Sequence, residues 1–427
     1  MTRAWWLVAI SGAAYFLSTG LGEVWPLAWI APLPVLVFAF ENSAGKAALA
    51  GCIAFLLGEL NLWTYLTAVI PPVLTAILLL LPASVFALAA VAGRWAVKRL
   101  RPWMAAFVFP LVWTGYEVLT AQVSPHGTAL SLGYTQTDFL PVLQIASLAG
   151  VHGITFVLCL VPSGLAVAWH KQSYAPLIPV AVISVLVLGY GAVRLNAASS
   201  GPRVKVGLAV TDEGVGRAFA TEDAELARQV VRGYADRVHR LAAQGAQVVV
   251  LPEKMVGVTP AYRAEVENML SEAARQSAVT LVAGLNLVGI SPRRNVAVVF
   301  GPDGRKLVEY DKRHMLPGPE SGYQVGDTPG LFLPWGVEIC KDMDFQPWSR
   351  EYARRGVKLL AVPAWDFVRD GRFHSRMAVV RGVENGFAIA RTAQQGLLTL
   401  SDSRGRILAE ASSGKAAEVL LVGELAP

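Results

Sequence analysis

The amino-acid sequence predicts two joined folds: an α-helical transmembrane bundle, then an α/β layered domain with a mixed sheet. Seven apolar stretches fill the first 195 residues, whereas residues from 203 onward carry an ordinary share of charged side chains. In that second part, strand-like patterns alternate with amphipathic helical patterns, which is typical of α/β domains. We therefore expect a transmembrane domain over residues 1–195 and a second domain over residues 203–427.

Composition supports this division and excludes one class of partner. The 427 residues are 54% apolar and only 16% charged, against about 25% charged in soluble globular proteins. The net charge is +6, but much of the excess lies in short loops between apolar stretches. Basic residues at such places set membrane orientation, so we predict membrane lipid as a partner and no nucleic acid.

The apolar stretches predict about seven membrane-spanning helices, since a span needs about 20 apolar residues. The predicted spans are residues 5–22, 25–40, 47–69, 73–93, 103–121, 140–169 and 176–195. The first two are short. The first does not have the pattern of a cleaved signal peptide, because another span follows at once.

Loop charges predict the orientation of these spans. Basic residues precede the first span and lie in alternate loops: Arg3, Lys46, Arg94, Lys98, Arg99, Arg101 and Lys171. The remaining loops lack lysine and arginine, so the positive-inside rule places the N-terminus in the cytoplasm. After seven crossings the second domain lies on the other face. We expect a multi-pass protein of a bacterial inner membrane with a periplasmic second domain.

Two acidic residues, Glu59 and Glu117, lie within predicted spans. A carboxylate inside a membrane is costly and therefore marks a functional site by default. The alternative is a neutral or hydrogen-bonded group at a helix interface. The sequence leaves both interpretations open.

The second domain has clear strand and helix patterns. Predicted helices are residues 222–244, 262–277, 347–355 and 373–385. Predicted strands are residues 204–210, 247–251, 280–286, 295–300, 306–310, 336–339, 358–362, 387–392 and 397–401, with a final pair reaching residue 422.

Three residues at the ends of these elements suggest nucleophilic chemistry. Cys340 and Glu253 each follow a predicted strand, and Lys312 follows a predicted hairpin. A thiol must lose its proton to attack, so a base and a nearby cation are expected. Strand ends on one edge of a parallel sheet meet in one crevice. Taken singly, each has an ordinary alternative, namely a packed cysteine or a solvated surface charge.

The segments around these residues resemble the nitrilase, or carbon–nitrogen hydrolase, superfamily. They read LPEKM, YDKRHMLPGPES, GVEICKDMDFQPWSREYARRGVKLLAVPAW and FHSRMAVVRGVENGFAIART. The resemblance implies an α-β-β-α sandwich. It also implies that Glu253 is the general base, that Lys312 stabilises the oxyanion and that Cys340 is the nucleophile.

The same resemblance implies three supporting residues. Glu320 matches a second glutamate that steadies the lysine, and Trp365 matches a tryptophan near the site. Asp342 lies in a Cys-Lys-Asp segment similar to that of soluble nitrilases. Neither a metal nor a cofactor is expected, because His239, His314 and His374 lack ligand spacing.

The first half of the chain narrows the resemblance. Its segments GCIAFLLGELNLWTY and LSLGYTQTDFLPVLQIASLAGVHGITFVL are similar to the apolipoprotein N-acyltransferase family. That likeness implies transfer of an acyl chain from a phospholipid donor to cysteine, as a thioester. The chain then passes to the N-terminal amine of a diacylglyceryl lipoprotein acceptor. The family normally has a further transmembrane helix after the catalytic domain, which we expect to be missing here.

Two other functions remain open. A membrane-anchored nitrilase-type amidase would use the same three residues to hydrolyse a C–N bond, and the Cys-Lys-Asp segment favours it. A non-catalytic membrane scaffold would not need them, and the presence of all three argues against it.

Overall fold

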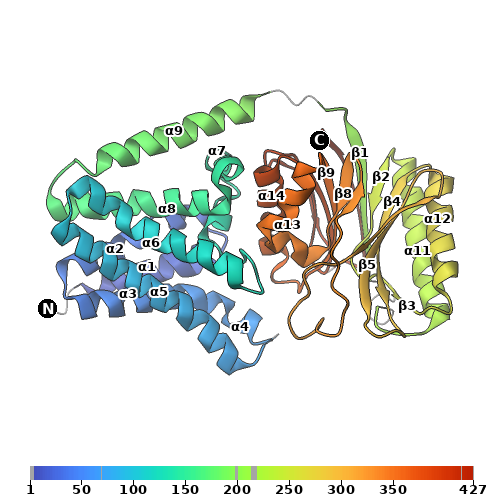
Figure 1. Ribbon diagram of the computed structural model, residues 1–427, viewed down its shortest axis with the longest axis horizontal. Helices are drawn as coiled ribbons and strands as arrows, with labels where there is room; N and C mark the ends of the chain where they lie inside the picture. The colour runs from blue at the N-terminus through green and yellow to red at the C-terminus, as the bar shows by residue number, and fades with distance from the viewer. Residues whose placement is uncertain (1–3, 69, 198–200, 213–218, 415, 427) are drawn as a thin grey trace. The chain divides into compact units, whose positions relative to one another are not determined.

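The computed structural model describes residues 4–68, 70–197, 201–212, 219–414 and 416–426. The chain divides into two compact units, Met1–Asn196 and Ala197–Pro427. In the described residues, the first unit is helical and the second contains two sheets with their covering helices (Figure 1).

The first unit is built from apolar helices. They are α1 (Trp5–Ser18), η1 (Trp25–Trp29), α2 (Pro32–Glu41), α3 (Ala44–Glu59), η2 (Leu60–Leu62), α4 (Trp63–Leu66), α5 (Pro72–Arg99), α6 (Pro102–Val123), η3 (Leu132–Gln136), α7 (Leu140–Leu143), α8 (Ala146–Lys171) and α9 (Leu177–Asn196). Within the described residues, five helical segments are long and apolar enough to cross a membrane: Ala44–Leu66, Pro72–Arg99, Pro102–Val123, Ala146–Lys171 and Leu177–Asn196. The two short predicted spans correspond to shorter apolar helices, Trp5–Ser18 and Trp25–Glu41.

One predicted span is interrupted. The stretch over residues 140–169 contains the separate α7 and α8, and Gly150 inside α8 has a non-helical backbone with φ of 65°. Glycine adopts a positive φ without the steric cost that a side chain imposes. Hydropathy alone gives one apolar run here, because the polar Gln144 at the break is surrounded by apolar residues.

Close helix packing in this unit depends on small residues. A Cβ added to Gly51 would lie 3.0 Å from the Cα of Ala87, and one added to Gly58 would lie 2.4 Å from the Cβ of Tyr15. Small residues allow neighbouring helices to approach closely, as is common in membrane bundles. The rings of Phe55 and Phe86 stack beside them at a centroid distance of 5.0 Å.

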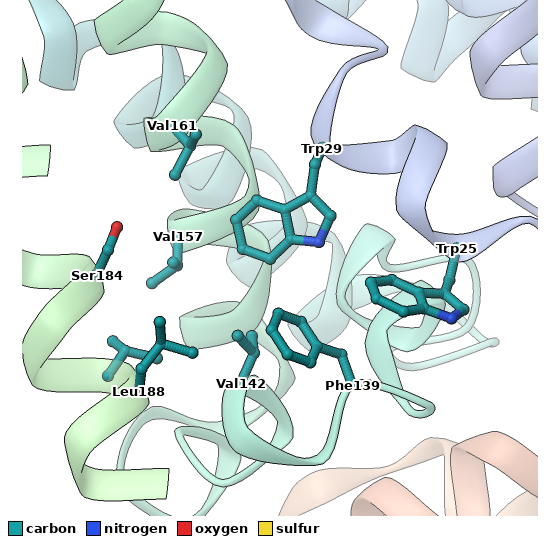
Figure 2. Close-up of a pocket in the computed structure, with 9 residues that line it drawn as sticks. Trp25, Trp29, Phe139, Val142, Val157, Val161, Ser184 and Leu188 are labelled. Atoms are coloured by element: carbon teal, nitrogen blue, oxygen red, sulfur yellow. The ribbon is translucent and has the colours of Figure 1, made fainter. Parts of the chain in front are cut away.

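A small apolar cavity of about 250 Å³ lies beside η1, α7, α8 and α9 (Figure 2). The Trp29 indole Nε1 donates to Oε1 of Gln136 at 2.7 Å, and Nε2 of Gln136 donates to the Trp25 carbonyl at 3.2 Å. The ring of Trp25 stacks on Phe139 at 5.2 Å. One buried amide therefore fixes the aromatic wall. The lining residues are Trp25, Trp29, Phe139, Val142, Val157, Val161, Ser184, Val187 and Leu188.

The second unit is a four-layer α-β-β-α sandwich. The first sheet has the order β13-β1-β2-β4-β5-β6, with β3 paired to β4, and the second has the order β12-β11-β10-β9-β8-β7. The first sheet and its helices are β1 (Val204–Thr211), α11 (Ala224–Ala243), β2 (Val248–Val250), β3 (Gly257–Val258), α12 (Arg263–Ser277), β4 (Thr280–Leu287), β5 (Arg294–Phe300), β6 (Lys306–Asp311) and β13 (Glu418–Leu425). The second sheet and its helices are β7 (Gly330–Phe332), β8 (Trp335–Val337), η4 (Cys340–Asp344), α13 (Gln346–Arg354), β9 (Leu359–Trp365), α14 (Gly371–Asn385), β10 (Ala388–Gln394), β11 (Leu397–Ser401) and β12 (Ile407–Ser412).

Successive side chains along a strand pack into different layers of the sandwich. In β2, Val248 and Val250 join the core between the sheets, whereas Val249 joins the core under α11 and α12. In β10, Ala388 joins the core between the sheets and Ile389 faces the cluster that includes α14 residues. Successive strand side chains point to opposite faces, so β2 and β10 are each buried on both sides.

Two details differ from the sequence-based expectation. The residue patterns predicted one mixed sheet, but the structure has two, as the family resemblance implied. The predicted final pair of strands is divided between the sheets, because β12 pairs with β11 in one sheet and β13 pairs with β1 in the other. Both connections satisfy the same polar and apolar pattern, so the pattern alone does not choose between them.

Candidate active site

The three predicted reactive residues come from both sheets. Glu253 and Lys312 follow β2 and β6 of the first sheet, while Cys340 follows β8 of the second. The expectation of convergence at the edge of a single sheet was therefore wrong. The two sheets are joined nearby, because the Glu253 amide donates to the Ala364 carbonyl at 3.4 Å and the Thr392 hydroxyl donates to the Val250 carbonyl at 2.9 Å.

Lys312 lies between two carboxylates. Its Nζ donates to Oε1 of Glu253 at 2.8 Å and to Oε2 of Glu320 at 2.9 Å. All three residues are 2% exposed. Asn295, the second residue of β5, adds a bridge, because its Nδ2 donates to Oε1 of Glu253 at 2.6 Å and to Oε1 of Glu320 at 2.9 Å.

The Glu320 carboxylate accepts hydrogen bonds from four groups. Beyond Lys312 and Asn295, its carboxylate accepts from Nζ of Lys254 at 2.5 Å and from the Leu316 amide at 2.8 Å. By contrast, the hydrogen bonds that the described residues give Glu253 both reach Oε1. Glu320 is thus held as a fixed anion, while Glu253 keeps an oxygen for proton transfer.

Charge interactions set the protonation of this cluster. Burial opposes the charge on Lys312, but the carboxylates of Glu253 and Glu320 outweigh it and hold its pKa well above the usual range. Burial also works against the Glu320 charge, yet the ammonium groups of Lys312 and Lys254 lower its pKa to about 2. Lys312 therefore stays cationic and can stabilise developing negative charge.

Cys340 is held in a sharp turn. Its φ is +46°, in the left-handed region, at the point where the strand segment changes into η4. Its Sγ lies 3.7 Å from the Trp365 carbonyl oxygen. A non-glycine residue in this region is strained, and such strain often marks reactive positions.

The Cys340 thiol is protonated at rest. Burial raises its pKa well above the ordinary value of 9.0, and the Glu253 carboxylate raises it further, while the Lys312 ammonium lowers it. A protonated thiol needs a base at the moment of attack. Glu253 is the carboxylate that acts on both Cys340 and Lys312, so it fits the role of base.

Asp342 connects the turn that carries Cys340 to the loop that carries Lys312. Its Oδ2 accepts from the Tyr310 hydroxyl at 2.7 Å and from the Ile339 amide at 3.0 Å. Its Oδ1 accepts from the backbone amides of Arg313 and His314 at 3.1 and 2.7 Å, and lies 3.0 Å from Nδ1 of His314. Asp342 is fully buried, so these contacts hold the two loops together.

Trp365 presents its backbone to the thiol and its ring to neighbouring aromatic groups. Its ring meets Phe219 edge-on at 4.9 Å. The next residue, Asp366, is buried and forms a two-point ion pair with Arg391 at 2.5 and 2.9 Å. This pair fixes the end of β9 beside Cys340.

Sequence reasoning missed several members of this site. Asn295, Lys254, Tyr310 and the Asp366–Arg391 pair carry no motif of their own. Lys254 was visible beside Glu253 in LPEKM, but its salt bridge to Glu320 joins residues 66 positions apart. The left-handed backbone of Cys340 has no signal in the sequence, because cysteine is not a residue that favours that region.

A second polar cluster lies in the first unit around Glu117. Its Oε1 accepts from the Trp113 indole at 3.1 Å and from the Leu132 amide at 2.9 Å. Its Oε2 accepts from the hydroxyls of Ser131 and Thr155 at 2.5 and 2.8 Å. These contacts join α6, η3 and α8, which supports the interpretation of Glu117 as a hydrogen-bonded group at a helix interface.

The described residues contain no group of three or more His, Cys, Asp or Glu side chains placed to hold a metal ion. The arrangement in the second unit instead combines a thiol, a base and a fixed cation. Together they can form and break an acyl–sulfur bond: the base takes the proton, the sulfur attacks a carbonyl carbon and the cation meets the oxyanion.

Comparisons with known proteins agree with this chemistry. The family model described as "Apolipoprotein N-acyltransferase N-terminal domain" matches residues 11–164, and that described as "Carbon-nitrogen hydrolase" matches residues 219–425. The chain is similar to the apolipoprotein N-acyltransferase of Geobacter metallireducens, with 27% identity in an alignment 460 residues long. The alignment covers 95% of this chain and 86% of that protein.

Two further proteins are similar to part of the chain. The omega-amidase NIT2 of Mus musculus is 29% identical over 212 residues, covering 41% of this chain and 76% of that protein. A solved amidase of Nesterenkonia sp. AN1 is 21% identical with a TM-score of 0.45, covering 54% of this chain and 93% of that one.

Proposed function

We propose that this chain, which belongs to the apolipoprotein N-acyltransferase family, moves an acyl chain from a phospholipid, through a thioester on Cys340, to the N-terminal amine of a lipoprotein. The observation that carries the proposal is the buried cluster in which Lys312 bridges Glu253 and Glu320 beside a free thiol. The relative with that named activity aligns with 95% of the chain, including the apolar helices.

In the first half-reaction, Glu253 takes the thiol proton as the Cys340 sulfur attacks the ester carbonyl of the phospholipid. The carbonyl oxygen becomes an oxyanion, which the Lys312 ammonium stabilises. When the C–O bond breaks, Glu253 returns the proton to the departing alkoxide. The products are a lysophospholipid and an acyl thioester on Cys340, with Glu253 again ionised.

In the second half-reaction, the neutral amine of a diacylglyceryl-cysteine attacks the thioester carbonyl. Glu253 accepts a proton from this nitrogen, and Lys312 again stabilises the oxyanion. The C–S bond then breaks and the sulfur regains a proton from Glu253. An amide replaces a thioester, so the transfer runs downhill without another energy source.

The membrane arrangement completes the proposal. The chain is a membrane protein by its family and its apolar helices. We infer that the domain over residues 1–195 crosses a bacterial inner membrane with its N-terminus in the cytoplasm. The catalytic domain over residues 203–427 is then periplasmic. Alternation of basic loops supports this orientation, and cysteine labelling of the loop at Lys171 from either side would test it.

A second function, amide hydrolysis, is favoured by two observations. The second unit is similar to omega-amidases over 212 residues, and Cys340 is followed by Lys341 and Asp342. Water in place of the amine would complete a hydrolysis by the same steps.

The deciding experiment follows the acyl group. The purified full chain is incubated with phosphatidylethanolamine carrying a labelled acyl chain, and the mass at Cys340 is measured before and after adding a diacylglyceryl peptide. The transferase predicts an acyl adduct that the peptide discharges as an amide. If no adduct forms while a short amide is hydrolysed, the amidase assignment replaces it.

A further inference from the structure

An exposed apolar turn follows β9 beside the nucleophile. Phe367 is 45% exposed and Val368 is 47% exposed. They come directly after Trp365 and Asp366, and the Trp365 carbonyl lies 3.7 Å from the Cys340 sulfur. Each residue advances the chain by at most about 3.6 Å. The exposed turn therefore begins within two residues of the carbonyl group that contacts the Cys340 sulfur.

This turn is firmly held. The Asp366 carboxylate is buried in its ion pair with Arg391. The Phe367 amide donates to Oδ1 of Asp370 at 2.7 Å, and the Val368 amide donates to the Gln395 carbonyl at 2.9 Å. Since both flanks are fixed, contacts at the tip cost little conformational entropy.

The backbone of the turn is strained to place these side chains. Val368 has a φ of +66°, where a β-branched residue is an outlier. Glycine or asparagine would adopt this conformation more easily. An exposed valine in a strained turn is unfavourable for stability alone, which points to a use for its apolar surface.

We propose that Phe367 and Val368 contact the hydrocarbon chain of the acyl group bound to Cys340, and so select long-chain acyl donors. This rests on the proposed function. An acyl chain attached to a buried thiol has to pass over the surface next to the nucleophile. Apolar side chains there remove its methylene groups from water, which is favourable in proportion to the buried area. A short amide has no chain to contact them.

The test compares donors that differ only in acyl length. Formation of acyl-Cys340 is measured by intact mass with dibutyryl and dipalmitoyl phosphatidylethanolamine in the same detergent. Variants are Phe367→Ser and Val368→Asn, and Leu307→Ser is the matched control because Leu307 is 48% exposed on β6. We expect Phe367→Ser to lower the ratio of long-chain to short-chain rates about tenfold, as loss of part of a buried phenyl side chain predicts.

Val368→Asn separates selection from folding. Asparagine fits the left-handed backbone, so thermal stability should not fall, whereas the chain-length ratio should drop severalfold. The control should leave the ratio unchanged. A ratio that stays at the wild-type value in both variants overturns the inference.

Other outcomes are equally decisive. If a variant lowers the acylation rate equally with both donors, the turn supports the site but does not distinguish acyl chains by length. A further result would be that the variants slow acylation equally with both donors, but only when the donors are in phosphatidylethanolamine vesicles and not in detergent. That result would mean that the turn contacts the membrane surface and not the acyl chain. If the wild type forms an adduct with neither donor, the proposed function itself fails.

Discussion

Glu117 in the helical unit and the Glu253–Glu320 pair in the sandwich are buried carboxylates with opposite kinds of partner. In the helical unit, Glu117 accepts four hydrogen bonds from neutral donors, an indole, an amide and two hydroxyls. In the sandwich, Glu253 and Glu320 share the ammonium of Lys312, and Glu320 also binds Lys254. Burial alone therefore does not distinguish a carboxylate at a helix interface from one in a charged cluster.

The difference lies in what each arrangement can do next. Neutral donors from three elements clamp Glu117, so its contacts stabilise helix packing. The charged cluster beside Cys340 contains a fixed cation that can stabilise a developing oxyanion. The Nδ1 of His152 lies 3.6 Å from Oε2 of Glu117, which is beyond hydrogen-bonding distance. The predictions below test this contrast.

The largest effect is expected at the nucleophile. Cys340→Ser should abolish turnover and acyl-adduct formation, because a serine hydroxyl is far less acidic than a thiol and this base is matched to sulfur. Turnover and intact mass are measured on the purified full chain. A serine variant with a substantial rate would show that Cys340 is not the group attacked.

Removing the bridging cation should come next. Lys312→Met should slow acylation by roughly 10²–10³-fold, about 3 kcal/mol, by analogy with loss of one oxyanion donor. The matched control is Lys306→Met, since Lys306 is a partly exposed lysine on β6 that pairs with Glu267 and Glu309. Near-normal acylation in Lys312→Met would remove Lys312 from the mechanism.

Substitution of Glu117 in the helical unit should lower the stability of the protein. Glu117→Ala leaves four donors without their acceptor and should lower the free energy of unfolding by about 1–3 kcal/mol. Glu117→Gln keeps the shape and one carbonyl acceptor, so it should lose less. Thermal unfolding in detergent measures both. The contrast fails if Glu117→Gln stays as stable as wild type but loses acylation, because Glu117 would then act in the chemistry.

The smallest expected effect is the contribution of Glu320 to stability at low pH. The pKa of Glu320 is lowered from its ordinary value of 4.5 to about 2 in the folded chain. A lowered carboxyl pKa stabilises the fold above the unfolded value, and this contribution is lost as pH falls from about 4.5 toward 2. Between pH 7 and pH 3, wild type should therefore lose more thermal stability than Glu320→Gln. If wild type and Glu320→Gln lose thermal stability to the same extent over this pH range, Glu320 is not a fixed anion in the folded chain.

Much of the architecture was predictable because it depends on local pattern. Apolar runs gave the membrane helices, and alternation gave the strands, since each pattern follows from side-chain direction. The division of strands between two sheets was not predictable from residues alone. Whether β13 pairs with β12 or returns to β1 depends on contacts between residues more than 200 positions apart.

The site was predictable only in part for the same reason. Glu253, Lys312 and Cys340 stood out by their flanking motifs. Asn295, which bridges two carboxylates, looks like any polar residue at the start of a strand, and its importance arises from distance in space. Motifs identify the reactive atoms, whereas the groups that hold them emerge from the fold.

Asp342 has a consequence for how this enzyme can change. One carboxylate ties the turn that carries the sulfur to the loop that carries the ammonium. Neither loop can be replaced alone without leaving buried donors unsatisfied. A graft of the cysteine turn from a soluble amidase should succeed only when the lysine loop is transferred with it, so the two segments form a single inherited module.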